Sequence, residues 1–198
     1  MMGKLFKMTV VVLFVLAAVG QANADEITDS IKEALEAYAE KEYAESVDSL
    51  GYALQLINQL RSDLIKGFLP KPLDGWKAEE GTAQAGAGFL GGSMIGASRV
   101  YRDKRKQVKI DINDAASPMM QGMMTMFSNP AFATAGGGKW QKIKRQKAIV
   151  KYNPDNRSGE ITMVVDNKYV VKLDGSKLDK EDMIAYAEAI DYKGLKNL

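Results

Sequence analysis

The chain has 198 residues, 46% of them hydrophobic and 26% charged, which is typical of a globular protein and not of a disordered one. Its formal net charge of +2 gives no strong bias toward acidic or basic partners. The absence of histidine and cysteine excludes disulfides and cysteine nucleophiles, and removes the side chain that does most general-base work near neutral pH. We therefore expect a protein that is not an enzyme and holds no cofactor.

The first 24 residues have the three parts of a secretory signal peptide. Lys4 and Lys7 form the charged start, residues 8–19 form an apolar run, and Ala22-Asn23-Ala24 has the small residues of a cleavage site. An uncleaved anchor helix is the alternative, but the run is shorter than the roughly 20 residues of a membrane span. We expect cleavage near Ala24-Asp25 and a soluble protein in the periplasm or outside the cell.

Charge is unevenly distributed along the rest of the chain. Residues 25–66 carry ten acidic and four basic side chains, whereas residues 67–150 carry six acidic and thirteen basic ones. After loss of Lys4 and Lys7 the total is balanced, so we expect no nucleic-acid partner. The acidic and basic segments could attract each other within one chain or between copies.

Residues 27–66 have helical periodicity, interrupted near Glu40 to Tyr43, which predicts a helical hairpin. Apolar residues recur at helical spacing, namely Ile31, Leu35, Tyr38, Val47, Leu50, Leu54, Ile57, Leu60 and Leu64. The segment resembles one tetratricopeptide-type hairpin, in which Ala34, Tyr43, Leu50, Ala53, Leu54 and Leu56 occupy the packing positions. One such repeat cannot bury its own face, so the resemblance implies that the hairpin packs on the following domain or on another subunit.

Residues 67–76 contain Pro70, Pro72 and Gly75, and we place the boundary there between a hairpin (25–67) and a main domain (68–198). A first strand is expected from Trp76 to about Gln84. The glycine-rich stretch 83–97 follows, and it lacks the ending of a phosphate-binding loop. It is either a loop folded over the sheet or an apolar loop that touches a membrane surface, a partner or an apolar ligand through Phe89, Leu90, Met94 and Ile95.

Strands are predicted at 98–101 and 107–112, around a basic turn at 102–106 that is either solvated or binds anionic lipid heads or polysaccharide. A helix starts at Ser117-Pro118 and carries a run of methionines. Met119, Met123 and Met126 form one stripe that either fills the core or binds an apolar ligand or partner. A methionine-only copper site is a less favoured interpretation, because it needs three converging sulfurs.

The last third of the chain predicts two hairpins, 139–153 and 160–173, and a final helix capped by Asp179 and Asp182. In the second hairpin we expect a three-residue loop at Val165-Asp166-Asn167, with Asn167 in the left-handed conformation. This loop places the apolar side chains on one face, namely Ile161, Met163, Tyr169, Val171 and Leu173.

The order of the elements predicts an α+β fold, with a helical hairpin followed by a mostly antiparallel sheet of about seven strands and helices on one face. Residues 68–198 are similar to PsbP-like exported α+β domains in this order, in the proline-and-glycine segment that leads to Trp76 and in the closing hairpin and helix. That class contains accessory and assembly factors more than enzymes, which implies a non-catalytic role.

Two functions therefore follow as expectations. The first is a binding or scaffolding protein of the cell envelope, which contacts a protein partner or a second copy through the helical hairpin. The alternative is a carrier of a small apolar or lipid-like ligand, held between the sheet and the methionine-rich helix. An enclosed apolar pocket would favour the carrier, and a solid core with an exposed apolar patch would favour the scaffold.

Overall fold

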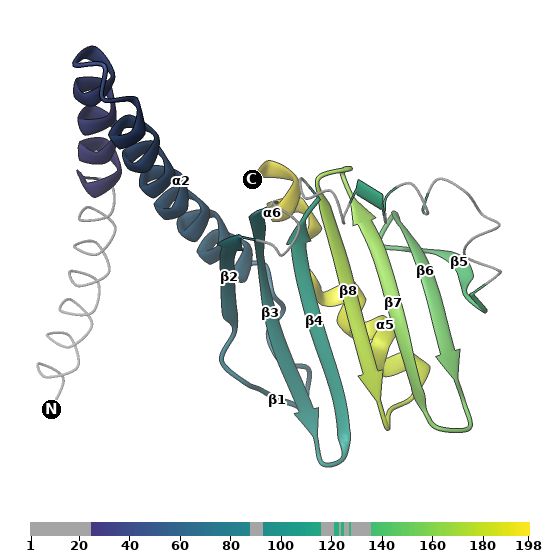
Figure 1. Ribbon diagram of the computed structural model, residues 1–198. Coiled ribbons are helices and arrows are strands. Elements are labelled where there is room, and N and C mark those ends of the chain that lie inside the picture. The colour runs from purple at the N-terminus through teal and green to yellow at the C-terminus, as the bar shows by residue number, and fades with distance from the viewer. Residues whose placement is uncertain (1–24, 88–92, 116–120, 123, 125–126, 128–135) are drawn as a thin grey trace, which may run out of the picture. The chain divides into compact units, whose positions relative to one another are not determined.

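A computed structural model of the chain describes residues 25–87, 93–115, 121–122, 124, 127 and 136–198 (Figure 1). The chain divides into two compact units, residues 1–58 and 59–198. The boundary between them lies inside helix α2 (Tyr43–Lys66), so the last two turns of this helix belong with the sheet.

The predicted helical hairpin is confirmed. Residues 25–39 are helical, and α2 begins at Tyr43 after a short turn in which Lys41 is left-handed, with a φ of 66°. The amide of Glu42 donates to the carbonyl oxygen of Ala37 at 2.9 Å and closes this turn. Helix α2 ends at Lys66, directly before Gly67, as the sequence indicates.

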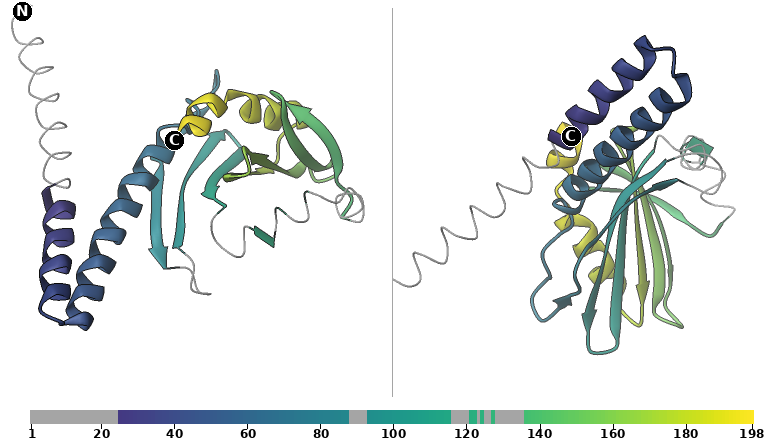
Figure 2. Two further views of the ribbon diagram at one scale, coloured as in Figure 1. Left: turned by 90° about the horizontal axis from the view of Figure 1, so that it is seen from above. Right: turned by 60° about the vertical axis from the view of Figure 1, so that its left-hand side comes forward.

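The α+β fold class is also confirmed, with one antiparallel sheet of eight strands where about seven were expected. The strands are β1 (Lys77–Ala78), β2 (Thr82–Ala87), β3 (Ser93–Asp103), β4 (Lys106–Asp114), β5 (Lys139–Ile143), β6 (Gln146–Asn153), β7 (Ser158–Val165) and β8 (Tyr169–Ser176). Their order across the sheet is β1-β3-β4-β8-β7-β6-β5, and β2 also pairs with β3. Helices α5 (Lys180–Ala189) and α6 (Tyr192–Asn197) lie along one face of the sheet (Figure 2).

The core lies between that face of the sheet and the helices. Alternate residues of the central strands point inward and are at most 4% exposed, among them Tyr101, Val108, Ile110, Ile112, Val150, Ile161, Met163, Val165, Tyr169, Val171 and Leu173. From the helical segment, Met183, Tyr186, Ala187 and Ile190 are buried against this face, and Ile184 is partly buried. On the opposite face, Lys172 pairs with Glu160 at 3.2 Å and with Asp174 at 3.0 Å.

The hairpin of β7 and β8 has the predicted face but not the predicted register. Val165 lies opposite Tyr169, so the three loop residues are Asp166, Asn167 and Lys168, one position later than expected. Asn167 is left-handed as predicted, and so is Asp166, with φ values of 52° and 54°. Moving the loop by one residue shifts each cross-strand partner by two, which leaves every side chain on the same face. The predicted buried face is therefore correct, although the predicted pairing of residues across the two strands is wrong.

The edge beside β3 is interrupted, whereas the sequence predicted one strand from Trp76 to about Gln84. Lys77 lies opposite Arg102 and Thr82 opposite Ser98, so this edge has one residue more than β3 between the same two pairs. The extra residue makes a bulge that separates β1 from β2.

Much of the glycine-rich stretch is strand and not loop, which corrects the prediction for residues 83–87 and 93–97. The two flanks pair with each other as β2 and β3, from Thr82 opposite Ser98 to Ala87 opposite Ser93. Gly96 fits here for a steric reason, because a Cβ at this position would lie 2.5 Å from both the Asn113 Oδ1 and the Ile112 carbonyl oxygen.

The end of β8 also differs from the prediction, in which the hairpin ended at residue 173. The strand continues to Ser176, and Gly175 leaves room for the Met183 side chain, whose sulfur would lie 2.7 Å from an added Cβ. The predicted cap of α5 is present, since the Asp182 carboxylate accepts the backbone N–H of Asp179 at 3.2 Å.

Replacing Gly96 by alanine should lower the free energy of unfolding by about 1–3 kcal/mol, because β3 and β4 must move apart to admit the methyl group. Urea denaturation checks this. Gly86→Ala is the matched control in β2, since a Cβ there has no atom within 4 Å, and it should be close to neutral. Equal stability of the two variants would contradict the packing described.

Stability should fall as the pH rises from 10 to 12, by roughly 1–3 kcal/mol for each of two buried tyrosines. Burial raises the pKa of Tyr101 and of Tyr186 to about 12, so the folded chain keeps protons that the unfolded chain loses near pH 10. The Tyr101 hydroxyl donates to the Pro70 carbonyl at 2.7 Å. Urea denaturation at several pH values in this range measures how steeply stability falls with pH, and Tyr101→Phe should make this fall smaller. Constant stability up to pH 12 would contradict the prediction.

Candidate interaction surface

The two helices of the hairpin meet through small side chains. The buried residues of this seam are Ser30, Ala34 and Ala37 from the first helix and Ser46, Ser49 and Ala53 from α2, all at most 9% exposed. The Ser46 hydroxyl donates to the Ala34 carbonyl across the seam at 2.8 Å, and the Ser30 hydroxyl donates to the Glu26 carbonyl at 2.9 Å. Since these hydroxyls are bonded, their burial leaves no unsatisfied polar group.

The large apolar side chains of the hairpin lie outside this seam. Eight of them are between 37% and 66% exposed, and we call them the apolar face: Ile31, Leu35, Tyr38, Tyr43, Val47, Leu50, Leu54 and Ile57. The rings of Tyr38 and Tyr43 lie 5.9 Å apart between centroids, which joins the stripes of the two helices at the turn. Contiguous apolar surface of this kind commonly marks an interaction site.

Helix geometry places both stripes on the same side of the hairpin. Leu35 directly follows the seam residue Ala34, and Leu54 directly follows Ala53. Four other members also follow a seam residue, namely Ile31, Tyr38, Val47 and Leu50. Tyr43 and Ile57 extend the stripe of α2 at the same spacing. One residue turns the helix by about 100°. The two helices run antiparallel (Figure 2, right). This same rotation therefore carries both stripes away from the seam toward one common side.

The opposite side of the hairpin is acidic. The residues that directly precede the seam positions are Asp29, Glu33, Glu36, Glu45, Asp48 and Tyr52. Residues 25–58 contain nine acidic and two basic side chains in all. The hairpin therefore has an apolar face and an acidic face, separated by the seam.

Of the residues proposed from the sequence as a contact surface, only Ile95 has a side chain among the described residues. Phe89, Leu90, Met119, Met123 and Met126 lie outside the described residues, as does the side chain of Met94 in β3. Ile95 is described, and at 4% exposure it belongs to the core of the sheet unit.

A cleft of about 600 Å³ lies at the end of the sheet where the β3–β4 and β6–β7 turns meet Lys177. Its lining includes Lys104, Arg105, Lys106 and Arg157, so it contains most of the basic turn noted in the sequence. Asp103 and Asp155 line the same cleft and offset part of this positive charge.

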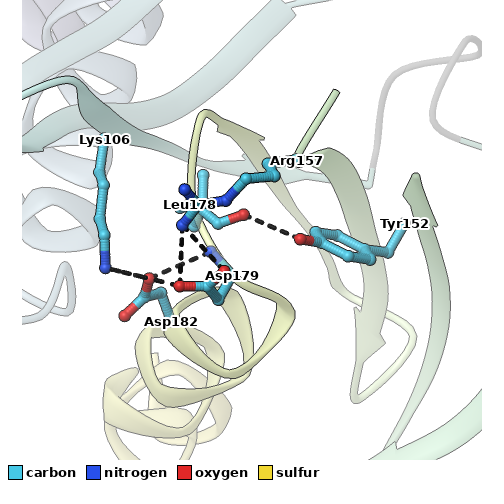
Figure 3. Close-up of polar contacts among 6 residues, drawn as sticks. All are labelled: Lys106, Tyr152, Arg157, Leu178, Asp179 and Asp182. Carbon is cyan, nitrogen blue, oxygen red and sulfur yellow. Dashed lines mark hydrogen bonds and ion pairs between the residues drawn. The ribbon is translucent and has the colours of Figure 1, made fainter. Parts of the chain in front are cut away.

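Two of these cations are already bonded to the start of α5 (Figure 3). Arg157 Nη2 lies 2.8 Å and 2.9 Å from the two carboxylate oxygens of Asp179, and Lys106 Nζ donates to Asp182 at 2.9 Å. The bond to Asp182 raises the pKa of Lys106. Two of the cations that line this cleft, Lys106 and Arg157, are therefore neutralised by carboxylates of the α5 N-terminus.

A second cleft, of about 540 Å³, lies beside the methionine-rich helix. Its apolar lining includes Met124, Ala115 and Tyr169, and its polar lining includes Arg61 and Asp114, which form an ion pair. Burial raises the pKa of Tyr169. A cleft with this mixture of groups is a poor match for a purely apolar ligand.

Among the described residues, no group of three or more acidic side chains is arranged to hold a metal ion. Within the same residues, none of the helices is long and apolar enough to cross a membrane. Comparison of the chain with protein-family models, with curated proteins and with solved structures gives no match.

Ala34→Leu and Leu35→Ala test which side chains hold the hairpin together. The leucine at position 34 overfills the seam and should lower the free energy of unfolding by about 1–3 kcal/mol, as insertions into packed cores do. Leu35→Ala should change stability by less than about 0.5 kcal/mol, because Leu35 is 64% exposed. Urea denaturation at low protein concentration, followed by helical circular dichroism, checks both. If Leu35→Ala were the more destabilising of the two, the leucine stripe would have to lie between the helices, which would contradict the structure.

Proposed function

We propose that the protein is a non-catalytic, exported binding or scaffolding protein of the cell envelope, and that it contacts its partner through the apolar face of the hairpin. The observation that carries this proposal is the exposure of eight large apolar side chains on one side of two helices. The signal-peptide pattern of residues 1–24 supports export.

The size of the apolar face supports association as its use. Eight half-exposed side chains present on the order of 800 Å², if each exposes about 100 Å². A specific protein–protein interface of standard size buries about 800 Å² on each partner. The apolar face is therefore large enough to hold a partner, whereas a few scattered leucines would not be.

The chemistry of the chain supports a non-catalytic role. Histidine and cysteine are absent from the whole sequence, so acid–base and nucleophilic catalysis would depend on carboxylates, hydroxyls and lysines alone. Some of the charges at the ends of the β-hairpins and on the open face of the sheet are engaged in structural pairs, such as Arg157–Asp179 and Lys172–Asp174.

A carrier of a small apolar ligand is the less supported alternative. The cleft beside Met124 has a substantial polar lining, with Arg61, Asp114 and Lys168 around it. Met119, Met123 and Met126, on which a ligand or copper site would depend, lie outside the described residues. The exposed apolar face supports a scaffolding function, and no comparable observation among the described residues supports a carrier.

In-cell photocrosslinking tests the proposed function. A photoreactive residue replaces Leu50 on the apolar face, and the same residue replaces Asp48 on the acidic face as the matched control. A parallel sample of the cells is fractionated without crosslinking. The protein should be recovered in the periplasmic fraction, with its N-terminus near Asp25. Adducts should form from position 50 and not from position 48. Retention in the cytoplasm, or equal labelling from both positions, would contradict the proposal.

A further inference from the structure

We infer that the partner of the apolar face is a second copy of this chain, and that two hairpins form a four-helix bundle. This inference rests on the proposed function, because it assigns an occupant to the same surface. It follows from the angle between the seam and the apolar face, from the spacing of the apolar residues and from the distribution of charge.

The angle between the two surfaces matches a bundle of four helices. In a bundle of square cross-section, each helix has two neighbours in directions about 90° apart. Here each helix meets its own partner through the seam, for example at Ala53, and presents the next residue, Leu54, about 100° away. The second direction is therefore where a helix of another hairpin would lie.

The spacing along α2 fits packing against another helix. Tyr43, Val47, Leu50, Leu54 and Ile57 follow one another at alternating intervals of four and three residues. This interval averages 3.5 residues, which keeps the stripe directed at a neighbouring helix in a left-handed bundle. Ile31, Leu35 and Tyr38 repeat the same intervals in the first helix. A membrane surface with anionic lipids is a poorer occupant, because residues 25–58 carry seven more acidic than basic side chains.

The distribution of charge allows two copies of the hairpin to meet without strong repulsion. Residues 25–58 carry a net seven negative charges, nine acidic against two basic. The carboxylates of Asp29, Glu33, Glu45 and Asp48 precede the seam residues and therefore lie on the side away from the apolar face. Two hairpins can meet face to face while their acidic sides point outward into solvent, where salt screens them.

The area is that of a stable dimer. If each hairpin contributes on the order of 800 Å², the pair buries roughly 1,600 Å², which is the standard size of a specific interface. The dimer would be isologous, with the same patch used by both copies, as in most two-chain assemblies.

The mass of the purified full-length protein in solution tests the inference, by sedimentation equilibrium over a range of concentrations. The protein should have twice the mass of one chain. Leu54→Glu should weaken the dimer by roughly 100-fold or more, because it places a charge within the apolar face that the dimer buries. Gln55→Glu is the matched control, since it adds the same charge one residue later, at an exposed position outside the apolar face, and should remain dimeric. Unchanged helical circular dichroism shows that both variants fold.

Cysteine crosslinking provides an independent readout, because the natural chain has no cysteine. Single cysteines at Val47, Leu50 and Leu54 are treated with a short bismaleimide, with Gln55→Cys as the control. At least one position of the apolar face should give a crosslinked dimer, and position 55 should give none.

A wild-type chain that stays monomeric up to about 100 µM would overturn the inference, as would a dimer that Leu54→Glu leaves intact. Two further outcomes separate this failure from that of the proposed function. If the monomer reacts freely at Leu54→Cys and position 50 still crosslinks to another protein in cells, only the identity of the partner is wrong. If position 54 is protected from maleimide in the monomer, the chain covers its own face and both proposals fail.

Discussion

The seam of serine and alanine side chains is the constraint on which the properties of the hairpin depend. With nothing larger than a hydroxymethyl group between them, the helices can approach at the close end of the 8–10 Å range of interaxial distances. The Ser30 and Ser46 hydroxyls donate to backbone carbonyls, and the Ser49 hydroxyl donates to the Glu33 carboxylate, so the seam is both tight and satisfied. A seam this narrow has no room for leucine or tyrosine, and the large side chains must lie elsewhere.

The sheet unit differs from the hairpin, because it buries its largest side chains. Tyr101, Met163, Leu173 and Tyr186 are fully buried between the sheet and its helices. The last turns of α2 take part in this packing, because Ile65 is fully buried and the Ser62 hydroxyl donates to the Gln84 carbonyl at 2.6 Å. One helix thus begins in a unit that buries small residues and ends in a unit that buries large ones.

The sequence predicted the elements that depend on local patterning. The fold class, the helical hairpin, the buried face of β7 and β8 and the Asp179–Asp182 cap follow from alternation, helical spacing and capping residues, which neighbouring residues determine. The register of β7 and β8 was missed because a shift of two residues in pairing preserves the pattern. The glycine-rich strands were missed because Gly86 and Gly96 depress strand propensity, although Gly96 is needed where β3 and β4 approach closely.

The candidate surface was only partly predictable, for a different reason. The apolar stripe of the hairpin is visible in the sequence, but periodicity identifies a stripe and not what covers it. The signal that the stripe lies outside the hairpin is the second, parallel series of small residues, Ser30, Ala34 and Ala37 with Ser46, Ser49 and Ala53. Small residues carry little weight in hydrophobic patterning, so this series stands out only when the two helices are placed side by side.

The interrupted edge of the sheet has a consequence for solubility. Strand edges that are long and regular act as templates for aggregation, and the danger grows when copies are held close together. In this sheet a bulge divides the edge beside β3 into β1, with two residues, and β2, with six uncharged residues, while β5 at the other edge has five residues and carries Lys139 and Lys142. Each described edge strand is therefore either short or carries lysines, which limits the joining of neighbouring sheets edge to edge.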